Sequence, residues 1–259
     1  MRKFLIFTIA APMASFGSLA VGERRPSANR PTKSQTIGLV AAALGIERGE
    51  ESRLAALRDS LGFAVRVEHA GQPAFDYHTT QTPSAKSIRD RAKAGRPVAT
   101  RADELSVPAQ EIKTILSTRE YRTGAMVSPA LWLRAEDAPV SLKALRDALL
   151  RPAFALFAGR KSHPLMLPCA PCIVEADNVA AAFAIHNAIP DHAATAALKQ
   201  RLGLPAGTSE AVIYSDPDGA PQETDHRIEQ RRDVPESRAK WRFGLRQEIV
   251  LAPTTGDAR

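Results

Sequence analysis

The stretch Phe4-Leu5-Ile6-Phe7-Thr8-Ile9 decides the fold, together with the polar segment and the helix that follow it. The apolar run predicts a buried first strand. The segment Gly22-Glu23-Arg24-Arg25-Pro26-Ser27-Ala28-Asn29-Arg30-Pro31-Thr32-Lys33-Ser34 carries three arginines and one lysine, and a helix of small residues is predicted from Gln35 to Gly45. Positive charge and free N–H groups at a helix start favour anions, so we expect a phosphate-binding site here.

The N-terminal stretch also resembles a secretory signal. Met1-Arg2-Lys3 precedes the apolar run, and Ser18-Leu19-Ala20 has the small residues of a cleavage site. However, Pro12 interrupts the run and bulky Phe16 lies close to that site, and the following helix would lose the strand that it packs against. We therefore expect the run to be retained as a core strand.

Composition limits the class of protein. The 259 residues can form one large domain or two small ones, and no run of about 18 apolar residues is present to cross a membrane. The formal net charge of +7 favours an acidic partner, with nucleic acid the first candidate. Two cysteines in a chain of this length do not form a disulfide scaffold, which fits a reducing cytoplasm.

The order of the predicted elements indicates the fold class. A second helix is expected from Ser52 to Gly62 and a half-buried strand over 63–68. A strand over 125–134, with Pro129 at an edge or a bulge, a helix over 141–150 and a fourth strand over 154–158 complete the series. This is the order of the split βαβ unit. The sequence thus predicts an α+β protein with a ferredoxin-like (RRM-like) βαββαβ core over residues 1–165.

Residues 71–123 are predicted to be an insertion in that core. Apolar residues are sparse there, prolines are frequent, and basic residues outnumber acidic ones over its first half. A long segment of this kind in a compact domain is functional or disordered, and its charge favours a projecting arm that contacts an anion. The basic residues are Lys86, Arg89, Arg91, Lys93, Arg96 and Arg101.

Residues 166–259 are predicted to form a smaller basic C-terminal subdomain. Helices are expected over 179–185 and 193–202, and strands over 211–214 and 249–251. The basic residues of its tail are Arg227, Arg231, Arg232, Arg238, Lys240, Arg242 and Arg246.

One metal-like pattern is present. Cys169 and Cys172 are followed after thirteen residues by His186 and then by His192, a spacing that fits the general two-Cys, two-His zinc template. Against this, Pro190 interrupts the helix that should carry both histidines, and the apolar residues of a zinc-finger core are missing. We expect no metal and no cofactor.

Catalytic motifs are largely absent. The sequence has no Gly-x-Ser-x-Gly elbow, no P-loop and no dinucleotide fingerprint. His78, in Asp76-Tyr77-His78, and His163, close to Lys161, could supply a general acid and a general base for RNA cleavage. A metal-free ribonuclease is therefore the alternative to a noncatalytic binding protein.

Three basic clusters favour RNA binding over an ordinary solvated surface. They are residues 24–33, Arg119-Glu120-Tyr121-Arg122 and Arg160-Lys161, each beside the end of a predicted strand or helix. In a ferredoxin-like unit the first and third clusters could meet at one end of the sheet. Arginine and lysine there would hold phosphates, and Tyr121 could stack on an unpaired base.

Taken together, several motifs resemble the CasD family, the subunit of the type I-E CRISPR effector complex (Cascade) that caps the 5′ end of crRNA. They follow the family's order over about the first two-thirds of the chain. The motifs are Phe4-Leu5-Ile6 through Ala11-Pro12-Met13 to Phe16-Gly17, Arg25-Pro26-Ser27, Pro31-Thr32-Lys33-Ser34, Gly38–Ile46, Phe63-Ala64-Val65-Arg66, Asp76-Tyr77-His78-Thr79, Arg119-Glu120-Tyr121, Ala130-Leu131-Trp132-Leu133 and Gly159-Arg160-Lys161-Ser162-x-Pro164-Leu165.

This resemblance implies an RRM-like core of the RAMP superfamily with a thumb-like hairpin arm over 71–123. It implies a noncatalytic, cytoplasmic protein that binds the 5′ handle of crRNA. The alternative is a metal-free endoribonuclease that processes CRISPR repeat RNA. The implied partners are the backbone subunits and the large subunit of Cascade, and target DNA indirectly through the guide. The segment 169–207 matches poorly, so no role is carried over to it.

The resemblance and the basic clusters together predict the RNA-contacting residues. Position matching assigns handle contacts to the loop before the helix, to Arg119 in the arm, and to the glycine-led loop after the fourth strand. The predicted set is Arg24, Arg25, Arg30, Lys33, Ser34, Gln35, Arg119, Tyr121, Arg160, Lys161 and Ser162.

Overall fold

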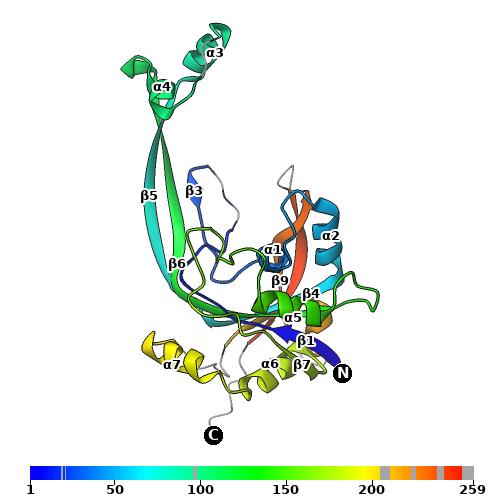
Figure 1. Ribbon diagram of the computed structural model, residues 1–259. Helices are drawn as coiled ribbons and strands as arrows, with labels where there is room; N and C mark the ends of the chain where they lie inside the picture. Colours follow the sequence, from blue (N-terminus) through cyan, green and yellow to red (C-terminus); the bar gives the residue numbers. More distant parts are fainter. Residues whose placement is uncertain are drawn as a thin grey trace. The chain divides into compact units, whose positions relative to one another are not determined.

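The computed structural model describes residues 1–18, 20, 22–95, 98–204, 211–222, 226–237 and 242–252 (Figure 1). Arg96, Arg238 and Lys240, three of the predicted basic residues, lie outside these ranges. The chain divides into two compact units. Unit 1 contains Met1–Gly17, Ser27–Ala74 and Tyr121–Arg259, and unit 2 contains Ser18–Pro26 and Phe75–Glu120.

Unit 1 is built on a sheet with the strand order β7-β1-β6-β4-β8-β10-β9, in which all neighbours are antiparallel. A further strand, β2 (Ile9–Ala14), also pairs with β6. The other strands are β1 (Arg2–Ile6), β4 (Leu61–His69), β6 (Ile112–Leu133), β7 (Cys172–Ala176), β8 (Ile213–Ser215), β9 (Arg227–Ser237) and β10 (Arg242–Leu251).

The predicted first strand is divided into β1 and β2, and Pro129 supplies the reason. Phe7 donates its backbone N–H to the Pro129 carbonyl (3.1 Å), but proline has no N–H to return that bond. The next donor, Thr8 N–H, bonds the carbonyl of Cys169 instead (2.7 Å). Pro129 was expected at an edge or a bulge. It lies instead in β6, an interior strand with β1 and β2 on one side and β4 on the other.

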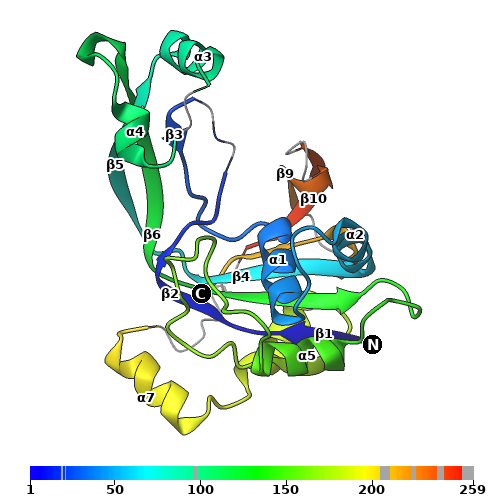
Figure 2. The same cartoon turned by 45° about the horizontal axis from the view of Figure 1, so that its top comes forward.

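Helices cover both faces of this sheet. The helices α1 (Lys33–Ala43), α2 (Glu51–Ser60) and α5 (Leu142–Leu150) pack on the face that carries Leu5 and Phe63 (Figure 2). The helix α6 (Val179–Asn187) packs on the face that carries Phe4 and Trp132. Because both faces are covered, β4 is buried on both sides over Leu61–Arg66, rather than half-buried as predicted.

The predicted helices form with small shifts at their ends. Helix α1 begins after Thr32, α5 begins after Ser141, and α7 (Ala193–Arg201) lies where the second C-terminal helix was expected. Helix α2 begins after Glu50 rather than at Ser52, and Leu61 already belongs to β4. None of the helices in the described part of the chain has the length and apolar character needed to span a bilayer.

The fourth predicted strand is wrong. Residues 154–158 contain only an isolated bridge between Phe157 and Pro164, and Phe154 is exposed. The place beside β1 is taken by β7, and β8 lies beside β4. Residues beyond 165 therefore complete the same sheet on both sides. For this reason the predicted boundary at residue 165 does not coincide with a boundary between the two compact units.

Besides Ser18–Pro26, unit 2 contains the greater part of β5 (Gln72–Pro83), the first part of β6, and the segment between them. That segment forms α3 (Ala85–Lys93), α4 (Arg101–Leu105) and the 3₁₀ turn η1 (Ala109–Glu111). Figure 1 shows β5 and β6 side by side, with α3 and α4 at the end where the two strands are joined. The short strand β3 (Arg24–Arg25) pairs in parallel with β6.

Candidate nucleic-acid interface

Unit 2 brings three of the predicted basic residues together. Arg24 and Arg25 of β3 are exposed, and the parallel register sets Arg24 opposite Thr118 and Arg25 opposite Arg119. Residues opposite each other project to the same side of a sheet, so the guanidinium groups of Arg25 and Arg119 share one side. Arg25 also donates through Nη1 to the carbonyl of Gly22 (2.5 Å), which holds its side chain along the strand. We call Arg25 and Arg119 the arm surface, whereas Arg24 projects to the other side of the strands.

Two other predicted residues of the same stretch are buried in unit 1. Arg30 is 9% exposed, and its guanidinium lies 3.3 Å from the ring centre of Tyr214 and 2.5 Å from the carboxylate of Glu248. Lys33 is 4% exposed, and its Nζ donates to Asp216 (2.8 Å). Burial lowers the pKa of Lys33, and the carboxylate of Asp216 opposes that shift. The prediction that Arg30 and Lys33 contact RNA is therefore corrected: both charges are used inside the protein.

The partners of these cations form a buried charge network. Arg246 donates through Nη1 to Asp216 (2.8 Å), and through Nη2 to Asp233 (2.9 Å) and Glu248 (2.8 Å). The three carboxylates are between 0% and 1% exposed. Burial alone would raise the pKa of Asp233, but the hydrogen bonds and charge of Arg246 hold it below its ordinary value. This network ties the start of α1 to β8, β9 and β10.

The N-terminus of α1 is not a free anion site. Thr32 and Gln35 form a capping box, in which each side chain accepts the backbone N–H of the other residue. The N–H of Lys33 donates to the carboxylate of Asp233 (2.9 Å), and the hydroxyl of Ser34 bonds that of Thr32 (3.0 Å). Asp233 thus occupies the position predicted for a phosphate, which corrects that expectation.

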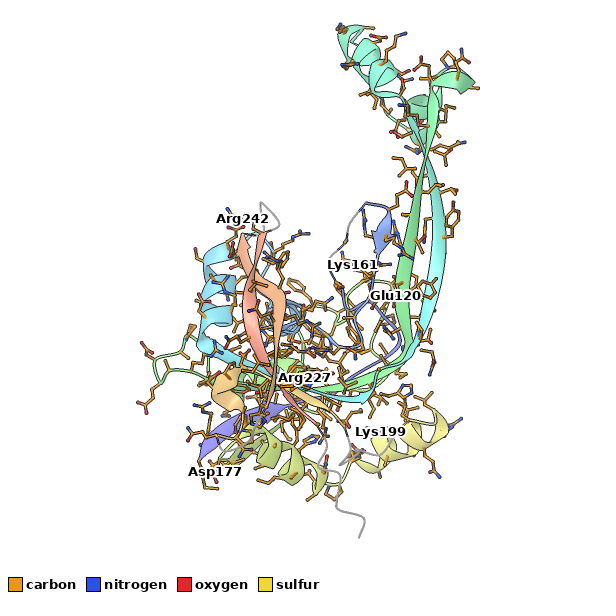
Figure 3. The ribbon with its side chains drawn as sticks, turned by 180° about the vertical axis from the view of Figure 1, so that it is seen from behind. Glu120, Lys161, Asp177, Lys199, Arg227 and Arg242 are labelled. Carbon is orange, nitrogen blue, oxygen red and sulfur yellow. The ribbon has the colours of Figure 1, made fainter. Side chains whose placement is uncertain are left out.

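The glycine-led loop forms a second basic surface, within unit 1. Gly159 has φ +88°, and a Cβ on it would lie 1.9 Å from the carbonyl oxygen of Ser15, so only glycine fits there. Gln35 donates to the same carbonyl (3.0 Å), so the start of α1 and the loop do meet. Lys161 and Ser162 are exposed, and Figure 3 labels Lys161 on this loop. We call Arg160, Lys161 and Ser162 the loop surface.

Tyr121 supports the loop and is not available for a base. It is 7% exposed, and its ring meets that of His163 edge to face at 5.3 Å. The guanidinium of Arg160 lies 4.8 Å from the centre of the Tyr121 ring. The predicted stacking of Tyr121 on RNA is therefore corrected, because the ring is already packed.

The two histidines proposed for catalysis have different surroundings. His163 is 2% exposed, and burial lowers its pKa. His78 lies on β5 in unit 2, where its Nε2 is 2.5 Å from the carboxylate of Asp76. Both members of that pair retain solvent exposure.

The Cys-Cys-His-His pattern does not converge. Cys169 packs on the α1 side of the sheet, where burial raises its thiol pKa to about 11, whereas Cys172 packs on the α6 side. His192 caps α7 by accepting the N–H of Ala194 (3.3 Å). Within the described ranges no three His, Cys, Asp or Glu side chains are grouped as metal ligands.

Sequence analysis missed two sets of residues. The first is Asp216, Asp233 and Glu248, the partners of the buried cations. Glu248 directly before Ile249-Val250-Leu251 was the available signal, since a charge at the start of a buried strand needs a partner. The second is the pair Phe75 and Tyr77, whose alternation with Asp76 and His78 indicates a strand with aromatic side chains on one face.

Comparison with known proteins agrees with the resemblance found in the sequence. The profile of the family described as CRISPR-associated protein (Cas_Cas5) matches residues 4–249. The protein named "CRISPR system Cascade subunit CasD" from Escherichia coli (strain K12) is 33% identical over 168 residues, which is 65% of this chain and 70% of the relative.

Two solved structures share the fold. A chain of the structure described as "CRISPR RNA-guided surveillance complex" is 24% identical with a TM-score of 0.61, over 96% of this chain and 90% of that chain. "Crystal structure of Cas protein" is 22% identical with a TM-score of 0.50, over 96% and 95% of the two chains. The resemblance to CasD is thus confirmed, and because the family profile spans nearly the whole sequence, this chain belongs to the CRISPR-associated Cas5 (CasD) family.

Proposed function

We propose that this chain is a noncatalytic RNA-binding subunit of a type I-E CRISPR surveillance complex (Cascade), in which it caps the 5′ handle of crRNA and supports defence against foreign DNA. The observation that carries this proposal is the parallel pairing of β3 with β6, which sets Arg25 beside Arg119 in unit 2. Two guanidinium groups on one side of a strand pair suit adjacent phosphates. The name of the relative CasD supports the complex.

The proposed partners follow from this role. The arm surface and the loop surface are the candidates for crRNA contacts, and the backbone subunits and the large subunit of the complex are the protein partners. The guide reads target DNA by base pairing, so this chain would contact the target only indirectly.

The proposed core is ferredoxin-like (RRM-like). The order β7-β1-β6-β4 supports it, since this is the 4-1-3-2 order of the split βαβ unit when β1, β4, β6 and β7 are taken as its four strands. The helices α1 and α2 join its first two strands, and α5 precedes the fourth. The thumb-like arm is then β5, α3, α4 and the first part of β6.

Burial at one candidate histidine supports the noncatalytic role over the endoribonuclease alternative. A general base must reach the 2′-hydroxyl that it deprotonates, and His163 is 2% exposed. His78 is the remaining candidate. Incubating the isolated protein with repeat RNA, with and without EDTA, tests this point. A discrete cut that disappears in His78→Ala or His163→Ala would overturn the noncatalytic assignment.

The binding proposal is tested with a double variant of the arm surface, Arg25→Ala/Arg119→Ala. Affinity for RNA carrying the 5′ handle should fall about tenfold or more at moderate salt, because two phosphate contacts are lost. The matched control is Arg53→Ala/Arg146→Ala, which removes the same charge from two arginines of α2 and α5 that pair with Glu50 and Asp147. Equal affinities of the two double variants for this RNA would contradict the assignment of Arg25 and Arg119 as RNA contacts.

A further inference from the structure

We propose that Phe75 and Tyr77 form a platform on which unit 2 stacks two unpaired RNA bases, with Arg24 holding a phosphate beside it. This inference rests on the proposed RNA-binding function and names the residues that would contact the bases. It assigns to β5 the stacking role that sequence analysis gave to Tyr121.

Exposure is the first observation. Phe75 and Tyr77 are 67% and 64% exposed, whereas Phe154 follows at 45% among the described aromatic side chains. Two neighbouring aromatic rings in water lose the free energy that burial normally supplies, so an exposed pair marks a binding surface more often than a lone exposed residue does. The two positions are separated by one residue on β5, so their side chains lie on the same side of the strand.

The register of β5 against β6 places this pair on the hairpin. Ser84 N–H bonds the carbonyl of Glu111 (2.7 Å) at the far end of the strands, and Thr123 Oγ1 bonds the carbonyl of Gln72 at the near end. Counting along the antiparallel strands from the Ser84–Glu111 backbone bond sets Tyr77 opposite Thr118 and Phe75 opposite Glu120. The same count sets Gln72 opposite Thr123, which agrees with the contact between these two residues.

The pairing of β3 extends the row across a third strand. Arg24 lies opposite Thr118 on the other edge of β6, so Tyr77, Thr118 and Arg24 form one row and project to one side. Neighbouring strands are about 4.8 Å apart, which places Arg24 roughly 10 Å from Tyr77, within the span of one nucleotide and an arginine side chain. By the same alternation Arg25 and Arg119 project to the opposite side.

Charge orients the strand of RNA on this platform. Arg24 is the cation of this row, so the RNA backbone belongs on its side and the bases lie over the rings. An aromatic face accepts any base, and the adjacent guanidinium supplies the phosphate contact; this combination is typical of proteins that bind single strands.

A hollow lies further along β5 toward α4. It has a volume of about 450 Å³ and is lined by Thr79, Thr80, Gln81, Arg101, Leu105 and Thr114. Thr79 and Gln81 follow Phe75 and Tyr77 in the alternation along the strand. Hydroxyl and amide groups in a hollow of this size can bond the edges of a base, so a third base would enter here after the two stacked ones.

The surroundings favour RNA over a protein partner. Around the two rings this side of the hairpin presents Thr79, Thr118 and Glu120, with Leu116 as a half-buried aliphatic neighbour. The exposed Ile115 projects to the other side by alternation. A protein-docking patch would be expected to surround its aromatic anchors with apolar side chains, whereas stacking needs only the ring faces.

The test uses the full chain and the double variant Phe75→Leu/Tyr77→Leu, which keeps apolar side chains and removes the rings. Affinity is measured for single-stranded handle RNA and for the same RNA with abasic sites. The double variant should bind the intact RNA about ten- to a hundredfold more weakly and the abasic RNA as wild type does. The single variant Tyr77→Phe, which keeps the ring and removes only the hydroxyl, should retain most of the affinity of the wild type. The dependence of affinity on salt should be unchanged, because no phosphate contact is lost.

The matched control is Ile115→Ala, an apolar residue of β6 that is 53% exposed on the other side of the hairpin, and it should bind RNA as wild type does. The platform is overturned if the double variant loses intact and abasic RNA equally. It is also overturned if RNA binding persists while the variant no longer copurifies with the other subunits, because the rings would then dock a protein.

If the arm-surface variant loses RNA and the ring variant does not, only the platform fails. If neither variant changes affinity, the RNA-binding assignment of unit 2 fails with it.

Discussion

Arg24 and Arg25 lie a few residues before Arg30 and Lys33 in one basic stretch, but the two pairs differ in their exposure to solvent. The first pair is exposed on β3 in unit 2. The second pair is buried in unit 1, where Asp216 and Glu248 neutralise it. In the sequence both pairs look equally suited to RNA, since each is a set of cations beside a proline.

A basic residue therefore indicates a binding surface only when no carboxylate of the same chain reaches it. Glu248 is 218 positions from Arg30, and Asp216 is 183 positions from Lys33. A buried cation without such a partner would be too costly to keep. Because these buried cations and carboxylates cancel in the net charge of +7, that charge does not show which basic residues remain available.

Removing a carboxylate from the buried charge network should destabilise the protein more than any other change considered. Asp216→Asn removes the carboxylate that Lys33, Arg134 and Arg246 share. The free energy of unfolding should fall by about 3–5 kcal/mol, because buried cations lose their counter-charge. The urea midpoint measures this change.

The matched control is Asp177→Asn, since the Asp177 side chain is 79% exposed and lies 3.6 Å from the N-terminal ammonium. It should leave the midpoint nearly unchanged. Equal midpoints for Asp216→Asn and Asp177→Asn would show that the network does not hold unit 1 together.

The loop surface is tested by Gly159→Ala. A Cβ there meets the Ser15 carbonyl and the backbone must leave φ +88°, so stability should fall by roughly 1–3 kcal/mol and the loop should shift. Gly95→Ala, at φ +60° with nothing within 4 Å of its Cβ, carries the conformational cost without the collision. Urea unfolding should therefore show a smaller loss of stability in Gly95→Ala than in Gly159→Ala. A larger loss in Gly95→Ala would contradict the close fit of Gly159 against Ser15.

The dependence of RNA affinity on salt distinguishes the exposed arginines from the buried lysine. Arg25→Ala should lower the slope of log affinity against log salt by about 1, because one phosphate contact disappears. Lys33→Met should leave the slope of the folded protein unchanged while lowering its stability, since the Lys33 charge already belongs to Asp216. Titrations of handle RNA at several salt concentrations measure both. A lower slope in Lys33→Met would return this lysine to the RNA-binding site.

The smallest expected effect is on the pH dependence of stability, through His163. Burial lowers the pKa of His163 below its ordinary 6.5, so the unfolded chain takes up the proton first as pH falls. The stability from neutral His163 is therefore complete above about pH 6.5 and is lost below it. His163→Phe should reduce the drop in unfolding midpoint between pH 7.5 and pH 5.5. Part of the drop in midpoint should remain, because burial also lowers the pKa of His186. A drop as large as that of the wild type would contradict a buried, neutral His163.

Most helices of unit 1 could be predicted because their signals are local. Ser141 and Asn178 cap α5 and α6 with their own side chains, and the apolar spacing of α1 defines its buried residues. The strand β9 was missed, because its sequence Arg227–Ser237 has no apolar alternation. It forms where β10 offers an open edge, and its acid Asp233 binds the start of α1.

The candidate site could be predicted only in part, for a related reason. The motifs identify the family and the positions of Arg25, Arg119 and Arg160. They do not tell that Tyr121 is packed against His163, or that Phe75 and Tyr77 are exposed, because exposure depends on which elements cover a strand.

The family, several apolar strands and the helices whose caps and stripes lie within a few residues of each other could be predicted from the sequence alone. Which basic residues remain available depends on the tertiary structure. Arg25 meets Arg119 and Lys33 meets Asp216 through strand pairing and packing between segments far apart in the chain. The physical reason is that helix signals act over one or two turns, whereas burial and charge neutralisation depend on every segment that reaches the same place.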